Sequence, residues 1–153
     1  MRRAAWFLAP VLILVLGSAP VRAASSPVFD VDTFGLELCP QSICHAAIFA
    51  GFVVGRVGNN PFAVGTFVVV ATHEPLPEPG ETADLIDGSF ELRFGLRRFR
   101  GTVEGGSLFN TGLNTFEVTA NLKLDNGDEL LYQGLLDHNV FPPTVAGPMV
   151  SVP

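Results

Sequence analysis

The stretch TFEVTANLKLDNGDELLYQGLL, Thr115 to Leu136, decides the fold class of this chain. Its first ten residues alternate between polar and apolar side chains, and a period of two is typical of a β-strand with one face in the core. The turn signal Asp125-Asn126-Gly127 follows, and a second apolar segment comes after it. The stretch therefore predicts an antiparallel β-hairpin.

Two registers compete for this hairpin. A two-residue Asn126-Gly127 loop would place Ala120 opposite Gln133 and mix polar with apolar side chains on one face. A three-residue loop, with Gly127 in the left-handed region, leaves one face almost wholly apolar. Because a slip of one residue moves a strand's apolar set to the wrong face, we predict the three-residue loop. It pairs Lys123 with Glu129, Leu122 with Leu130, Ala120 with Tyr132, Val118 with Gly134, and Phe116 with Leu136.

Short strand-like segments separated by turn signals make up most of the remaining chain. Val28–Leu38 alternates, whereas Ala46–Val57 and Phe62–Thr72 are almost continuously apolar. Continuous apolar strands indicate burial on both faces, so the outer face is expected to be covered or to pack on a partner. Glycines inside these strands suggest bends or bulges. We predict an all-β fold, a single antiparallel β-barrel of about eight short strands, with a β-sandwich as the alternative.

The segment after residue 84 holds a second clean alternation. It predicts inward positions for Phe90, Leu92, Phe94 and Leu96, and a change of phase near Arg97-Arg98 predicts a tight turn or bulge there. Further turns are expected at Gly105-Gly106 and over residues 110–114. Prolines predict an irregular loop over residues 73–84 and a docked extended tail after residue 139.

The N-terminal stretch has the features of a secretory signal peptide. Arg2 and Arg3 precede a short apolar run that Pro10 interrupts, and Val21-Arg22-Ala23 fits a small-x-small cleavage site. The run is shorter than the roughly 20 residues that a membrane-spanning helix needs. We expect a signal peptide over residues 1–23, a secreted or periplasmic barrel domain over residues 24–153, and no transmembrane helix in the mature chain.

The mature chain is strongly acidic. Without Arg2, Arg3 and Arg22 it keeps six basic and fifteen acidic residues, a formal net charge of −9. The electrostatic field of such a protein repels polyanions. Nucleic acid is therefore excluded as an expected partner.

Cys39 and Cys44 are the only cysteines, in the segment C-P-Q-S-I-C. An exported protein meets oxidising conditions, so a disulfide across a tight loop is expected. Free thiols remain open, as does a metal site that adds His45. Adjacent ligands are awkward in an extended strand, because neighbouring side chains point to opposite faces. We expect neither a metal nor a cofactor.

Several short motifs carry a resemblance. The run Ile86-Asp87-Gly88-Ser89-Phe90 is followed by RGTVEGG at residues 100–106, then by Asn126-Gly127 and Tyr132-Gln133-Gly134. This pattern resembles a group of small, uncharacterised bacterial β-barrel domains of calycin-like shape. The resemblance implies a barrel fold and brings no activity with it.

The candidate ligand-binding residues centre on arginine. Arg93, Arg97, Arg98 and Arg100 are four of the six mature basic residues. Guanidinium groups bind carboxylate, sulfate or phosphate in a bidentate manner, although such a cluster is also typical of a solvated strand face. Tyr132 is a further candidate.

Two functions follow from these features. The first is an exported, non-catalytic barrel that binds a small apolar or anionic ligand or a partner chain, including a second copy of itself. The alternative is a small barrel enzyme of the cyclase, isomerase or lyase type acting on an apolar substrate. Its reactive groups would come from Glu91, Arg93, Tyr132 or His138. No catalytic residue is assigned by the sequence.

Overall fold

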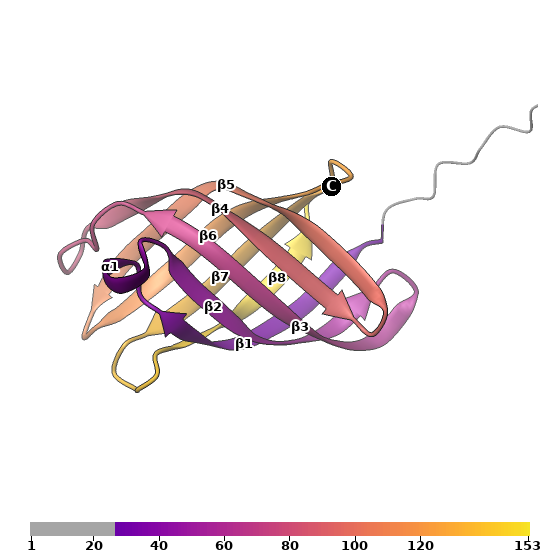
Figure 1. Ribbon diagram of the computed structural model, residues 1–153, viewed down its shortest axis with the longest axis horizontal. Coiled ribbons are helices and arrows are strands. Elements are labelled where there is room, and N and C mark those ends of the chain that lie inside the picture. The colour runs from indigo at the N-terminus through magenta and orange to yellow at the C-terminus, as the bar shows by residue number, and fades with distance from the viewer. Residues whose placement is uncertain (1–26) are drawn as a thin grey trace, which may run out of the picture.

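Eight antiparallel strands, each hydrogen-bonded to the next along the chain, form a closed barrel (Figure 1). The computed structural model describes residues 27–153, and the predicted signal peptide at 1–23 lies outside the described residues. The last strand pairs with the first, which confirms the barrel over the sandwich. The elements are β1 (Phe29–Cys39), α1 (Gln41–Cys44), β2 (Ala47–Val57), β3 (Asn60–His73), β4 (Thr82–Phe94), β5 (Arg97–Gly112), β6 (Thr115–Leu124), β7 (Glu129–Asp137) and β8 (Thr144–Ser151).

The hairpin of β6 and β7 has the predicted register. Lys123 pairs with Glu129, and every other predicted pair down to Phe116 and Leu136 is present. Gly127 adopts a φ of 93°, in the left-handed region that favours glycine, and its N–H donates to the Leu124 carbonyl at 2.8 Å. The hydrophobic pattern is therefore sufficient to fix this register, because only one pairing puts both apolar sets inside.

The hairpin of β4 and β5 confirms three of its four predicted inward positions, since Phe94 also packs against the core, and corrects one. Phe90 and Leu92 face the core as expected, but Leu96 is fully exposed. Leu96 lies in the two-residue turn that follows Phe94, and this turn is the source of the change in phase.

Gly105 and Gly106 were expected in a turn, and that prediction is wrong. They lie inside β5, where the pairing with β6 shifts between Val103 and Gly105 as a bulge. A Cβ on Gly106 would lie 2.0 Å from the Thr119 carbonyl oxygen. The glycines thus permit a close approach of two strands, a use of glycine that resembles a turn signal in sequence.

The two proline-rich segments of the chain are both ordered against the barrel. The expected extended tail is confirmed as extended and includes β8, the strand that closes the barrel between β7 and β1. The irregular loop is shorter than predicted and spans residues 74–81. It folds back on the barrel because the Asn110 side chain donates to the Pro77 carbonyl at 2.7 Å.

The two ends of the barrel differ. The end at which β1 begins and β8 ends, here called the terminal end, is filled by Phe29, Phe94 and Phe99, whose rings pack against one another with centroids 5.1–6.4 Å apart. Leu92, which pairs with Phe99 across β4 and β5, is fully buried. The opposite end carries α1 and the loops between β3 and β4 and between β7 and β8 (Figure 1).

The outer surface is apolar on one side and charged on the other. On β1 to β3 the outward side chains include Phe34, Phe52 and Val64, all exposed, and Phe34 pairs directly with Phe52 across the strands. The outward positions of β4 to β6 are instead mostly polar or charged, with Ile86 and Phe109 as the exposed large apolar residues there. The described residues leave the apolar side uncovered.

No helix between residues 27 and 153 has the length and apolar character needed to cross a bilayer.

Candidate functional site

The half of the barrel nearer α1 encloses a cavity of about 420 Å³. This volume lies within the roughly 300–1,000 Å³ that is typical of small-molecule sites. Residues of α1 and of the loop at 74–81 border it, whereas the Phe29, Phe94 and Phe99 cluster does not. The cavity is therefore blind at the terminal end and opens toward α1. Its apolar wall includes Phe67, Val69, Leu108, Val118, Leu136 and Met149.

The cavity exists because small side chains occupy the inward positions of this half. Ala47, Ala71 and Ala120 are buried and line it, and Ala47 pairs with Ala71 across β2 and β3. At the other end the corresponding space is filled by phenylalanine rings. The same alternation of strand residues thus yields a packed plug at one end and a hollow at the other, depending only on side-chain volume.

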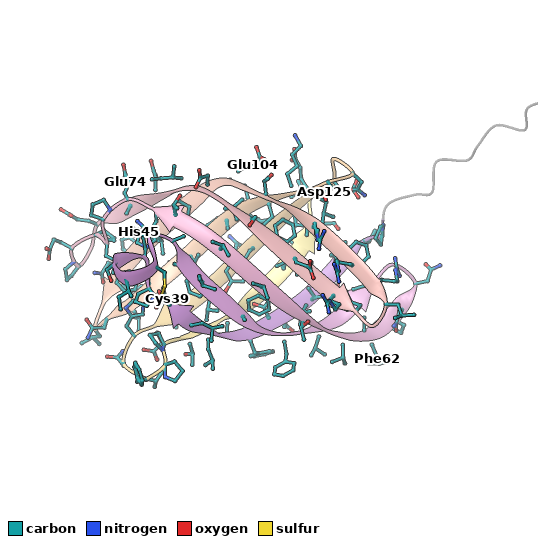
Figure 2. The ribbon with its side chains drawn as sticks, viewed as in Figure 1. Cys39, His45, Phe62, Glu74, Glu104 and Asp125 are labelled. Carbon is teal, nitrogen blue, oxygen red and sulfur yellow. A yellow bond between two sulfur atoms is a disulfide. The ribbon has the colours of Figure 1, made fainter. Side chains whose placement is uncertain are left out.

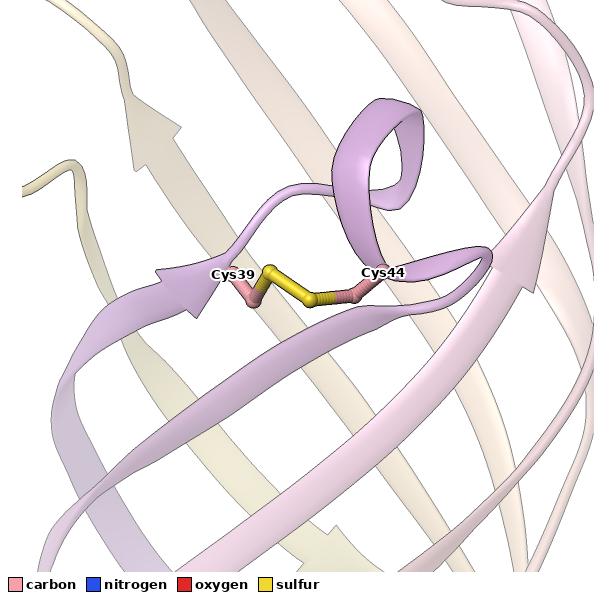
Figure 3. The surroundings of a disulfide bond; sticks show 2 residues. All are labelled: Cys39 and Cys44. Carbon is pink, nitrogen blue, oxygen red and sulfur yellow. A yellow bond between two sulfur atoms is a disulfide. The ribbon is translucent and has the colours of Figure 1, made fainter.

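The opening of the cavity is held by α1. Cys39, at the end of β1, forms a disulfide with Cys44 at the end of α1, as predicted (Figure 3). The Gln41 side chain is clamped to the backbone of His73, donating to its carbonyl and accepting from its N–H, both at 2.7 Å. Cys39, His45 and Glu74 all lie at this end, away from Phe62 (Figure 2).

The alternative of a metal site at the cysteines is not supported, because the two thiols are joined to each other. Across residues 27–153, no three His, Cys, Asp or Glu side chains are grouped so that they could hold a metal ion.

A buried carboxylate and an imidazole face each other in the cavity wall. Glu37 Oε2 lies 3.1 Å from His138 Nε2, and the Glu37 side chain is only 4% exposed. The two atoms are not oriented as a hydrogen bond, and neither has another hydrogen-bond partner among the described residues. The ring of His138 packs against Phe116, with centroids 5.3 Å apart. The contact is an ion pair when the imidazole is protonated, but neither atom makes a hydrogen bond of ordinary geometry, which is costly for buried polar atoms. This pair is therefore the most informative polar feature of the cavity.

Tyr132 supplies the third unpaired polar atom of the cavity. Its hydroxyl lies over Gly134, where a Cβ would come within 2.0 Å of it, and it has the Thr33 hydroxyl as a polar neighbour but makes no hydrogen bond of ordinary geometry in the described structure. Burial raises the pKa of Tyr132 to about 12, against a lowering effect of the neighbouring Thr33 hydroxyl. Thr33 itself donates to the Gly147 carbonyl at 3.0 Å. The tyrosine therefore stays neutral and offers both a donor and an acceptor.

The four arginines lie away from this cavity, on the outer face of β4 and β5. Three of them converge on Glu91, with contacts of 3.0 Å from Arg93, 3.3 Å from Arg98 and 2.8 Å from Arg100. The hydrogen bond from Arg100, helped by Arg93 and by the charge of Arg98, holds the pKa of Glu91 below its usual value against desolvation.

Arg97 instead stacks over the Phe99 ring, 5.1 Å from its centroid. The structure thus brings three of the predicted ligand-binding arginines together but separates all four from Tyr132.

Sequence reasoning missed Glu37 and singled out His138 only as a possible reactive group. Glu37 stands between Leu36 and Leu38, and in an isolated strand the acid would be expected to face water. The inward phase is set further back by Phe29 and Val31, both buried. Because every second residue of a strand faces the same side, the inward position of Val31 places Glu37 inward as well. The alternation at the start of β1 therefore indicated that Glu37 faces the interior.

Comparisons of this chain with protein-family models, with curated proteins and with solved structures found no significant match. The resemblance to calycin-like domains therefore stays a prediction.

Proposed function

We propose that this chain is an exported, non-catalytic β-barrel that binds a small apolar ligand in its interior cavity. The supporting observation is a cavity of about 420 Å³ with a predominantly apolar wall, closed at one end and bordered by the α1 segment at the other. Apolar walls with a few polar groups are typical of small-molecule sites. The disulfide and the predicted signal peptide support a secreted or periplasmic location.

Catalysis is the less favoured proposal because the suggested reactive residues do not share a site. Glu91 and Arg93 contact each other on the outer face, whereas Tyr132 and His138 line the cavity. Binding of an anion at the arginine cluster also ranks lower, since three of these guanidinium groups already share the Glu91 carboxylate.

Filling the cavity is expected to weaken ligand binding without unfolding the protein. Val118 faces the cavity and is only partly buried, so a phenylalanine at this position would extend into free space. We expect the neutral fluorescent probe N-phenyl-1-naphthylamine to bind the wild-type protein with one site per chain. Val118→Phe should weaken this binding by at least about tenfold, or about 1.4 kcal/mol. Fluorescence titration measures the affinity.

The matched control adds the same ring to the adjacent residue on the opposite face. Glu117 is exposed on the outside of β6, so Glu117→Phe should leave probe affinity unchanged. Circular dichroism checks that both variants keep the fold. Equal loss of affinity in the two variants, or no binding by the wild-type protein, would contradict an interior site.

A second proposed function, self-association, is favoured by the apolar outer side of β1 to β3. Phe34, Leu36, Phe52, Val54 and Val64 are all exposed there. A two-fold interface sets a patch against itself, and the five side chains of this patch carry no charge. The charged residues of this side, Asp32 beside Val54 and the ion pair of Asp30 with Arg56, lie at the edge of the patch. We therefore propose a second copy of the chain as the partner on this side.

Replacing Phe52, 63% exposed in the middle of this side, by serine is expected to weaken the dimer by at least about tenfold. Sedimentation equilibrium across a concentration series gives the dissociation constant. The control is Phe109→Ser, because Phe109 is also exposed but lies on β5, outside the apolar side. A wild-type protein that is monomeric at every concentration would refute self-association.

A further inference from the structure

The unpaired polar atoms of the cavity restrict the chemistry of its ligand. Oε2 of Glu37 and Nε2 of His138 lie 3.1 Å apart without the geometry of a hydrogen bond, the hydroxyl of Tyr132 makes no hydrogen bond of ordinary geometry in the described structure, and all three residues line the cavity. A purely apolar ligand would leave these atoms unsatisfied, and each buried unpaired polar group costs stability. The wall is therefore better matched by a ligand that carries one small polar group on an apolar body.

We propose that the ligand is a neutral apolar alcohol whose hydroxyl group donates a hydrogen bond to the Glu37 carboxylate. This inference rests on the proposed interior binding site and specifies its ligand class.

The charge of the site favours a hydroxyl over the other small polar groups. A ligand carboxylate would bring a second carboxylate beside that of Glu37, whose side chain is 4% exposed and has the His138 imidazole as its polar neighbour. An ammonium group would lose its hydration on entry and would compete with His138 for the same oxygen. A hydroxyl needs no charge, donates to Glu37 and keeps lone pairs that can accept from Tyr132 or His138.

The order of these groups along the barrel orients the ligand. β7 runs toward the α1 end, and the Tyr132 ring extends in this direction until its hydroxyl lies over Gly134. His138 follows directly after the end of β7, and Glu37 is near the corresponding end of β1. The polar groups thus lie toward the opening, and the apolar body of the ligand would extend toward the Phe29 end.

The experiment compares four ten-carbon ligands as competitors of N-phenyl-1-naphthylamine: decanol, decylamine, decanoate and decane. A hydrogen bond to a charged group corresponds to roughly a tenfold or larger gain in affinity. We expect decanol to bind the wild-type protein at least about tenfold more tightly than decane, and decanoate to bind more weakly than decanol. Equal binding of decanol and decane, or tighter binding of decylamine or decanoate, would overturn the proposal.

A substitution of Glu37 tests whether this residue causes the preference for decanol over decane. Glu37→Met keeps an unbranched side chain of similar length and removes the acceptor, so it should bring decanol and decane to similar affinities. The control is Glu117→Met on the outer face, which should keep the wild-type preference. Should Glu37→Met fail to fold, the four wild-type affinities still decide the matter.

The two proposals fail in different ways. A probe that does not bind at all refutes the interior site. A probe that binds, is excluded by Val118→Phe and is displaced equally by decanol and decane refutes only the alcohol.

Discussion

Replacing Phe29 by alanine is expected to lower the free energy of unfolding by about 3–5 kcal/mol, the usual cost of removing a buried aromatic ring. Phe29 is 1% exposed, and its ring meets Phe99 edge to face with centroids 5.1 Å apart. The ring closes the terminal end of the barrel, so its removal leaves a void between Phe94 and Phe99 that a closed sheet cannot collapse to fill. Since the free energy of unfolding of small domains is only about 5–15 kcal/mol, this substitution removes a large fraction of the stability.

Urea unfolding followed by circular dichroism measures this loss, and another strand phenylalanine supplies the comparison. Phe62 is 85% exposed on β3, and Phe62→Ala removes the same ring with an expected change of less than about 0.5 kcal/mol. Similar costs for the two substitutions would show that the Phe29 end is not a packed plug.

Alternation in the sequence was sufficient to predict the all-β class and the β6–β7 register, whereas the barrel was favoured over a sandwich by consecutive hairpins and by glycines inside the strands. Only one pairing of Thr115–Leu124 with the following strand puts Leu122 and Leu130 on the same face, and the structure has that pairing. The disulfide followed from the compartment that the leader predicted and from the spacing of the two cysteines. In each case a local pattern carried the decisive physical constraint.

The cavity could not be predicted, because it depends on which inward-facing residues from different strands lie at the same height along the barrel axis. Ala47, Ala71 and Ala120 come from three strands, and nothing local shows that they face a common space. Glu37 was hidden for a related reason: its neighbours Leu36 and Leu38 are apolar but face outward on the uncovered side of β1. When a strand carries apolar residues on both faces, the sequence does not show which of the two alternating sets of residues faces the interior.

The arginines show the opposite limitation. Their closeness in sequence suggested a binding site, yet strand pairing turns Arg93, Arg98 and Arg100 toward one carboxylate, that of Glu91. The short spacing of the arginines in the sequence indicated that they cluster. The orientation of β4 and β5 places this cluster on the outside of the barrel, away from Tyr132.

Raising the pH from about 9 to about 13 is expected to remove about 3 kcal/mol of stability through Tyr132 alone, with most of the loss between about pH 10 and about pH 12. Burial raises the pKa of this side chain to about 12 in the folded protein, against an ordinary value of 10.0. Between these values the folded state holds a proton that the unfolded state has released, so the free energy of unfolding falls as the pH rises. Two pKa units at about 1.4 kcal/mol each give the magnitude.

Tyr132→Phe separates this contribution from the titration of the basic residues, because both proteins share the latter and only the wild type contains a tyrosine. At neutral pH the variant should be as stable as the wild type or slightly more so, since the hydroxyl that it loses makes no hydrogen bond of ordinary geometry in the described structure. Its urea unfolding should then lack the additional loss of stability above about pH 10. The ultraviolet absorbance of tyrosinate gives a direct reading, because it reports this residue alone. A midpoint near 10 in the folded protein would mean that water reaches the hydroxyl freely, and the cavity would then be open to solvent down to Gly134.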